Sequence, residues 1–181
     1  MTVADPSSEV AAMQPAWELA GALLGGTTAM RNAGATYLPK WPKEDHDTWL
    51  SRKAVSVLFP AYKRTVETLT GKPFSKPVTV GEDVPPIIAP WLMDIDLQGR
   101  NLDVFLSDQM ETALGYGLSG ILVEFPTRPE DVRTLADERQ AGLRPYWVHI
   151  KPTQILGWRA QRVGGEWRLM QLRFMRSEER V

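Results

Sequence analysis

The sequence predicts an α+β fold, in which a helical N-terminal two-thirds packs on a small, mainly antiparallel sheet that includes a C-terminal hairpin. Three observations support this prediction. Apolar residues recur at helical spacing through much of the first two-thirds of the chain, and strand-like runs dominate the last third. Helices that precede strands, rather than alternating with them, are typical of α+β domains. Gly164-Gly165 separates the last two strand-like runs and is a strong hairpin signal.

The N-terminal region is expected to contain two consecutive helical stretches. Residues 1–8 form a flexible start, and Ser7-Ser8 supplies a cap for the first helix. Pro15 lies inside the apolar pattern and is expected to open a second stretch, because proline fits the first turn of a helix. Gly25-Gly26 then ends that stretch, and a short helical turn follows at residues 28–32.

The next helical region follows an extended surface loop at residues 35–43, which contains two prolines. Asp45 and Asp47 favour a helix start after this loop, because the helix dipole stabilises acids in the first turn. This helix is expected to run as far as Leu58. Pro60 then interrupts it, and the helical pattern resumes beyond the proline.

The centre of the chain is predicted to hold a short strand, a helical turn and one long helix. The strand is expected at residues 78–80 and the turn within the proline-rich residues 84–93. Asn101 and Gly117 are the expected N-cap and C-cap of the long helix. The apolar residues of this helix form one stripe: Leu102, Leu106, Met110 and Ala113.

The C-terminal third is predicted to be mainly strand. Strands are expected at residues 119–125 and 145–150, with a short charged helix between them at residues 135–141. A hairpin is expected over residues 156–175. Apolar residues alternate along the first of these strands and therefore share one face: Ile121, Val123 and Phe125.

Composition limits what the protein does. The 181 residues suit a single domain spanning residues 1–181, with 43% hydrophobic residues. The net charge of −1 shows no basic excess for tight nucleic-acid binding. The chain has no cysteine, which excludes disulfides, thiol catalysis and thiolate metal sites. Its longest apolar run, Ile87–Met93, is too short for a membrane span of about 20 residues.

Candidate catalytic and metal-binding patterns are weak, and neither a cofactor nor a metal is expected. The two histidines, His46 and His149, have no cysteine partners for a zinc site. The run that begins at Asp94 resembles a calcium loop, but Phe105 occupies the position where the loop requires glutamate. Glu124 is the one carboxylate in an apolar strand, and a metal-dependent hydrolase or nuclease that pairs it with Asp131 is an alternative hypothesis.

Aromatic residues indicate binding rather than catalysis. The chain has seven tryptophans, a residue type that is prominent both in protein cores and in interface hot spots. Trp41 lies in a loop between prolines, where burial in the core is difficult, although a loop that folds back on the core is an equal alternative. The interface candidates are Tyr37, Trp41 and Trp91.

Five segments in order carry a family resemblance: LLGGTTAMRNAGATYLPK (residues 23–40), GKPFSKPV (71–78), ALGYGLSGILVEFP (113–126), LADERQAGLRPYW (135–147) and ILGWR (155–159). Together they resemble the N-terminal half of tailed-phage portal proteins. They are most similar to a portal-like family long catalogued as a domain of unknown function in phages and prophages.

The resemblance implies a structural, non-enzymatic role in the virion at the capsid portal vertex, with assembly in the host cytoplasm. Portal proteins form dodecameric rings through which double-stranded DNA is packaged and ejected without tight binding. Their partners are other portal subunits, the major capsid protein, the terminase and a tail adaptor. The resemblance implies no membrane partner. The chain matches the wing region, and the stem, clip and crown are expected to be absent from it.

Two departures from the family pattern leave an alternative open. The chain ends at Val181, far short of a portal, and Pro60 lies in a helix that is uninterrupted in the family. A stand-alone prophage adaptor that binds other proteins without forming a ring is therefore a second hypothesis.

Overall fold

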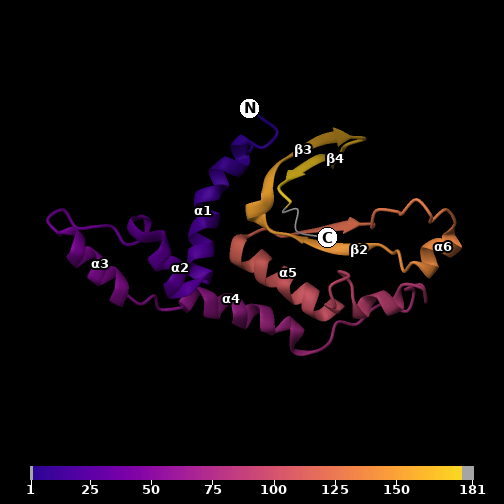
Figure 1. Ribbon diagram of the computed structural model, residues 1–181, viewed down its shortest axis with the longest axis horizontal. Helices are drawn as coiled ribbons and strands as arrows, with labels where there is room; N and C mark the ends of the chain where they lie inside the picture. Colours follow the sequence, from indigo (N-terminus) through magenta and orange to yellow (C-terminus); the bar gives the residue numbers. More distant parts are fainter. Residues whose placement is uncertain (1, 177–181) are drawn as a thin grey trace.

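The computed structural model describes residues 2–176 and confirms the predicted α+β fold. In this part of the chain, six α-helices surround two antiparallel sheets of two strands each (Figure 1). Helix α1 lies beside the hairpin and the near end of the first sheet, α2 and α3 extend to one side as an arm, and the C-terminal hairpin rises above the first sheet. None of the helices in the described residues combines the length and apolar character needed to cross a bilayer.

Helix α1 (Ser8–Leu24) is continuous, so the predicted division at Pro15 is wrong. The Oγ atom of Ser7 caps this helix by accepting a hydrogen bond from the backbone N–H of Val10. Pro15 lies on the exposed side of the helix, where water can bind the carbonyl that proline leaves without a partner. Helix α2 (Gly26–Ala33) follows directly and contains the predicted turn.

Pro60 separates two helices as predicted, but the first of them ends earlier than expected. Helix α3 (His46–Val55) begins at its N-cap, Asp45, and stops three residues before Leu58. Helix α4 (Ala61–Gly71) begins directly after Pro60. The intervening backbone is extended because α2 binds it. Arg31 donates to the carbonyl of Ser56 at 2.9 Å, and the N–H of Leu58 donates to Thr27 Oγ1 at 3.1 Å.

The predicted strand at residues 78–80 is wrong, because no second strand lies beside it in the described structure. The N–H of Val78 instead donates to Oδ1 of Asp103 at 2.6 Å. This carboxylate lies in the first turn of α5, so the hydrogen bond ties an irregular segment to a helix. The predicted helical turn within residues 84–93 is present as a 3₁₀ helix, Ala89–Met93.

Helix α5 (Leu102–Tyr116) has both predicted caps. Asn101 accepts from the N–H of Val104, and Gly117 is left-handed at φ 77°. The predicted apolar stripe is only half-buried, and the face that becomes fully buried carries Phe105 and Gln109. Phe105 is selected because its ring packs edge-on against Trp147 of the sheet, at 5.7 Å between ring centroids.

The first sheet pairs β1 (Gly120–Glu124) with β2 (Tyr146–Ile150), and Gly120 lies opposite Ile150. The short helix α6 (Leu135–Gln140) lies in the connection and begins with a capping box. The apolar residues predicted to share one face of the first strand are exposed in the structure: Ile121, Val123 and Phe125.

The main core lies where α1 meets both sheets. Its buried members are Val10 and Trp17 of α1, Ile150 of β2 and Ile155 of β3. The indole N–H of Trp17 donates to the carbonyl of Tyr116 at 3.1 Å, which joins α1 to the end of α5. The second sheet is the predicted hairpin of β3 (Ile155–Val163) and β4 (Glu166–Phe174). Only the base of this hairpin reaches the core.

Candidate interaction surfaces on the arm and the hairpin

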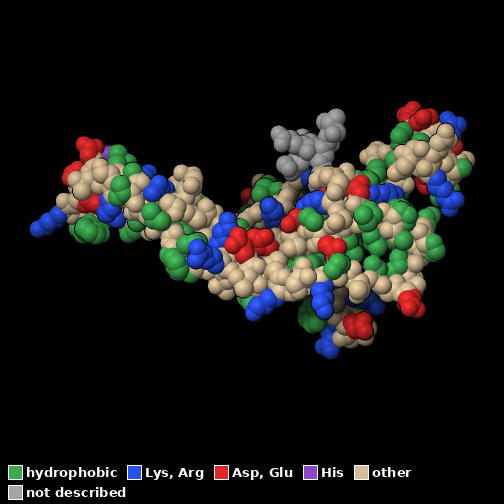
Figure 2. Space-filling view, turned by 90° about the horizontal axis from the view of Figure 1, so that it is seen from below, with side chains coloured by type: hydrophobic (Ala, Val, Ile, Leu, Met, Phe, Trp, Pro, Cys, Tyr) green, Lys and Arg blue, Asp and Glu red, His purple; other side chains and the backbone are tan. Residues whose placement is uncertain are grey.

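The arm, residues 26–60, carries the first of two exposed apolar surfaces. Figure 2 shows it projecting from the body, with apolar, acidic and basic side chains at its outer end. Val57 and Phe59 are 78% and 73% exposed in the extended segment between α3 and α4. Single exposed apolar side chains are common on proteins, but clusters of them are unusual and mark interaction sites.

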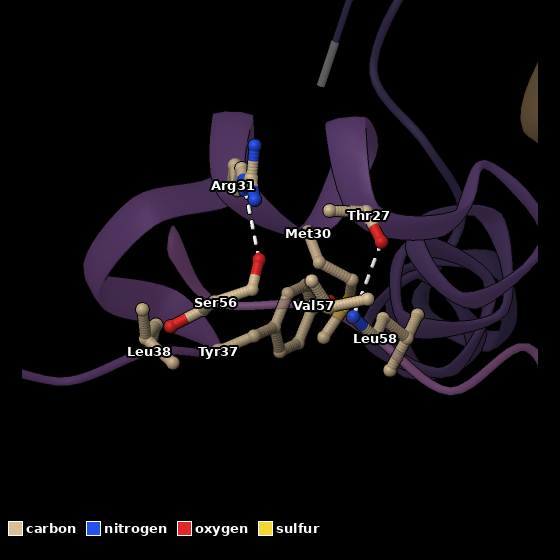
Figure 3. Close-up of a pocket in the computed structure, with 8 residues that line it drawn as sticks. All are labelled: Thr27, Met30, Arg31, Tyr37, Leu38, Ser56, Val57 and Leu58. Atoms are coloured by element: carbon tan, nitrogen blue, oxygen red, sulfur yellow. Dashed lines mark hydrogen bonds between the residues drawn. The ribbon is translucent and has the colours of Figure 1, made fainter. Parts of the chain in front are cut away.

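Tyr37 lines a cavity of about 200 Å³ between α2 and the extended segment (Figure 3). The cavity is mainly apolar, and the two hydrogen bonds that bind residues 56–58 to α2 cross its wall. Tyr37 is half-buried there. Tyr37 therefore contributes to the packing within the arm. Val57, which lines the same cavity, remains exposed. The cavity is lined by Thr27, Met30, Arg31, Tyr37, Leu38, Ser56, Val57 and Leu58.

Trp41 is 65% exposed at the outer end of the arm. The guanidinium of Arg52 lies over its ring at 4.9 Å from the centroid, which fixes the indole without covering it. Arg52 also donates to both oxygens of Glu44 at 2.8 Å, and these hydrogen bonds lower the pKa of Glu44 to about 2. The result is a rigid, mostly apolar hollow around Trp41 with ionised carboxylates at its rim.

Trp91 lies apart from the other two interface candidates. It is half-buried in the 3₁₀ helix before α5, and the guanidinium of Arg144 lies 6.0 Å from its ring centroid. Arg144 also forms an ion pair with Asp94 at 3.1 Å. The structure therefore places Tyr37 and Trp41 on one arm and Trp91 on the body, and the role of each in an interface stays a prediction.

The hairpin carries the second exposed apolar surface. Its register places Trp158 opposite Leu172 and Arg162 opposite Trp167 on one face, with Ala160 opposite Leu169 between them. Trp167 near the tip is 74% exposed. The other face is polar and pairs Arg159 with Gln171 and Gln161 with Arg168. Sequence analysis did not identify these faces, because a bulge at Met170 shifts the alternation partway along β4.

Glu124, the proposed hydrolytic carboxylate, already has two partners. Its Oε2 accepts from the hydroxyl of Tyr146 at 2.8 Å, and its Oε1 pairs with Arg176 at 2.7 Å. Asp131 is exposed in the loop that follows β1. Across residues 2–176, no three His, Asp or Glu side chains gather closely enough to hold a metal ion.

A polar cluster that sequence analysis missed lies between α5 and the first sheet. Ser119, Gln109 and His149 meet there, with 3.2 Å between the serine Oγ and the histidine Nε2. Burial, followed by the nearby charge of Lys151, lowers the pKa of His149. His149 lines a cavity of about 370 Å³ together with Asp108. The sequence signal for this cluster was limited to the two predicted strands, residues 119–125 and 145–150. Their pairing brings Ser119 close to His149.

Comparison with known proteins does not assign the chain to a family. No protein-family model matches the sequence, and no curated protein matches it.

Proposed function

We propose that the chain is a non-enzymatic assembly protein, the wing portion of a tailed-phage portal, that associates with copies of itself in a ring at the capsid vertex. The observation that carries this proposal is the distribution of apolar surface. The arm and the hairpin project from different parts of the body, and each leaves large apolar side chains exposed. Proteins that remain monomeric rarely expose apolar patches of this kind, so the two surfaces favour binding to partners.

Ring symmetry accounts for two different surfaces on one chain. Rings form through heterologous contacts, in which one surface of a subunit binds a different surface of the next subunit. A contact between the hairpin of one copy and the arm of the next closes a ring when it repeats in one direction, whereas a reciprocal exchange of the same contact gives a two-fold dimer. The ordered segments that resemble portal proteins support the same proposal, and they add capsid protein, terminase, tail adaptor and passing DNA as further partners.

The side-chain chemistry also favours assembly over catalysis. The candidate base Glu124 is held by Tyr146 and Arg176, and the exposed tryptophan of the arm is held by Arg52. Tryptophan and arginine are the residue types that dominate binding hot spots. The stand-alone adaptor hypothesis uses the same surfaces but requires a chain that remains monomeric.

The test is the assembly state of the purified chain. Sedimentation velocity over a wide concentration range should show association, and negative-stain electron microscopy should show closed particles with rotational symmetry. A monomer at every concentration would overturn the proposal and favour the adaptor. Metal-dependent hydrolysis that is lost in Glu124→Gln would also overturn it.

A further inference from the structure

The outer part of the hairpin lacks a covering layer in the described structure. Its base, residues 155–157, is buried, but the strands beyond are exposed on both faces. An isolated two-stranded hairpin is marginally stable in water and needs further strands or a helix against its apolar face. That face carries Trp158, Leu169, Trp167 and Leu172. A partner surface is therefore needed to bury it.

The charge of the hairpin limits the choice of partner. Residues 155–176 contain five arginines and one glutamate, a net charge of +4, whereas the chain as a whole carries −1. Two hairpins would repel each other, so pairing of hairpin with hairpin is disfavoured. A partner for this hairpin should combine apolar surface with acidic groups.

The outer end of the arm, residues 41–49, has these properties. It carries three acids, Glu44, Asp45 and Asp47, against one lysine. Glu44 and Asp45 line the hollow beside the exposed ring of Trp41, together with Lys43 and Arg52. The hollow beside this ring has an apolar floor and is open enough, at about 630 Å³, for a large side chain to enter. Glu44 and Asp45 remain ionised at neutral pH, because hydrogen bonds lower the pKa of both carboxyl groups.

We infer that the hairpin tip of one copy docks into the arm hollow of a second copy, with the indole of Trp167 against Trp41 and the arginines beside it facing the arm carboxylates. This inference rests on the proposed self-association and names its contact. The Arg162–Trp167 pair supplies a guanidinium and an indole side by side on one face. The arm and the hairpin project from different parts of the molecule. Each copy can therefore contact one neighbour through its hairpin and another through its arm, and the contact repeats from each copy to the next.

Crosslinking tests the contact directly, because the chain contains no cysteine. Glu166→Cys places a thiol at the hairpin tip and Lys43→Cys places one at the arm hollow. A bismaleimide should link the two variants when they are mixed and should link neither variant to itself. Links within either single variant would overturn the inference, as would an associated mixture that yields no links.

Charge reversal tests the same contact in solution. Arg162→Glu, which changes the arginine beside Trp167 on the docking face, should weaken self-association by roughly tenfold or more, as expected for a hot-spot change. Asp47→Lys on the same chain should restore it, because the reversed pair is again complementary. Arg159→Glu is the matched control, since it makes the same charge change on the opposite face of the hairpin. Circular dichroism verifies that each variant is folded.

The outcomes separate this contact from the broader proposal. Association that persists unchanged in Arg162→Glu and Trp167→Ser overturns the contact but leaves self-assembly intact. A monomeric parent chain overturns both. A hairpin that instead binds a labelled DNA duplex, with binding lost in Arg162→Glu and self-association unchanged, assigns the basic surface to nucleic acid and overturns the inference.

Discussion

The hydroxyl of Ser119 lies 3.2 Å from Nε2 of His149, yet the pair is not arranged as a nucleophile and its base. The amide of Gln109 donates to the carbonyl of Gly120, which leaves its oxygen to accept the serine proton. His149 must therefore donate to the serine through Nε2–H. The histidine is in its neutral form, and the cluster links helix α5 to the first sheet through hydrogen bonds.

The first prediction concerns the pH dependence of stability. Burial lowers the pKa of His149, so below the unfolded value of about 6.5 the unfolded chain binds more protons than the folded chain. Stability should be full above that pH and should fall as the pH drops toward the folded value. Arg100 and Lys151 oppose the charged form, and Asp108 favours it. Urea unfolding between about pH 7.5 and 5.5 measures the loss.

His149→Gln supplies the control for this prediction, because the longer amide of glutamine can reach the position of Nε2 and donate to Ser119 but does not titrate. The variant should show a flatter profile than the parent chain over the same pH range. His46→Asn, which changes the exposed histidine of α3, should keep the parent profile. Equal slopes in all three proteins would contradict the assignment of the loss to His149.

The second prediction concerns the buried ion pair of Asp96 and Arg100. Asp96 is 1% exposed, and its Oδ2 pairs with Arg100 at 2.5 Å. Burial alone would raise the pKa of Asp96, but the guanidinium and two backbone N–H groups hold it below its ordinary value. Asp96→Asn should cost about 1.5–3 kcal/mol of unfolding free energy, because it removes a charge-assisted hydrogen bond to Arg100, which keeps Asp108 as its other partner.

Asp47→Asn is the comparison for Asp96→Asn, since it makes the same change at an exposed carboxylate. It should cost about 0.5 kcal/mol or less. Chemical denaturation of both variants at neutral pH measures the difference. Similar losses in the two variants would show that burial of the Asp96 pair does not govern its contribution.

The third prediction follows from the continuous helix α1. Pro15 removes one backbone hydrogen bond from the interior of this helix at an exposed position. Proline in a helix interior costs about 3 kcal/mol relative to alanine. Pro15→Ala should therefore raise the unfolding free energy by about 1–3 kcal/mol. The gain is at most the full proline cost, because the helix is already adjusted to the proline. An unchanged or lower denaturation midpoint would show that the proline shape is needed for packing.

The accuracy of the sequence-based predictions depended on how local each signal was. The helix start at Asp45, the N-cap at Asn101 and the turn at Gly164-Gly165 were predicted correctly, because each depends on neighbouring residues alone. Pro15 misled the prediction because its exposed position is set by tertiary packing. Phe105 was missed because the choice of the buried helix face depends on Trp147, which lies far away in sequence.

The candidate surfaces show the same division. The proline-flanked loop left exposure of Trp41 and its burial against the core as equal alternatives, and the structure shows the ring 65% exposed. The apolar face of the hairpin was not anticipated, because a bulge within β4 moves Met170 out of the alternation of side chains between the two faces. The Ser119–His149 cluster needed the exact register of the first sheet, which the sequence pattern leaves open by one residue in either direction.

The fourth prediction concerns Glu124, the residue on which the hydrolase hypothesis depends. Its partner Arg176 is 47% exposed and Glu124 is 19% exposed by side chain, so the ion pair contributes little, about 1 kcal/mol or less. Glu124→Gln should keep the fold and lower the unfolding free energy by about that amount. Tyr146→Phe should cause a similar loss, because it removes the other hydrogen bond of the same carboxylate.

The fifth prediction concerns Phe105, which is fully buried beneath the first sheet. Phe105→Ala should cost about 3–5 kcal/mol, because the cavity removes contacts with Trp147 and His149. Val104→Ala is the matched control on the same turn of α5, where the side chain is 47% exposed, and should cost about 1 kcal/mol or less. Equal losses would mean that α5 packs on the sheet through a different face. A large loss for Phe105 alone, accompanied by a change in the near-ultraviolet signal of the tryptophans, would show that α5 packs on the sheet through the contact between Phe105 and Trp147.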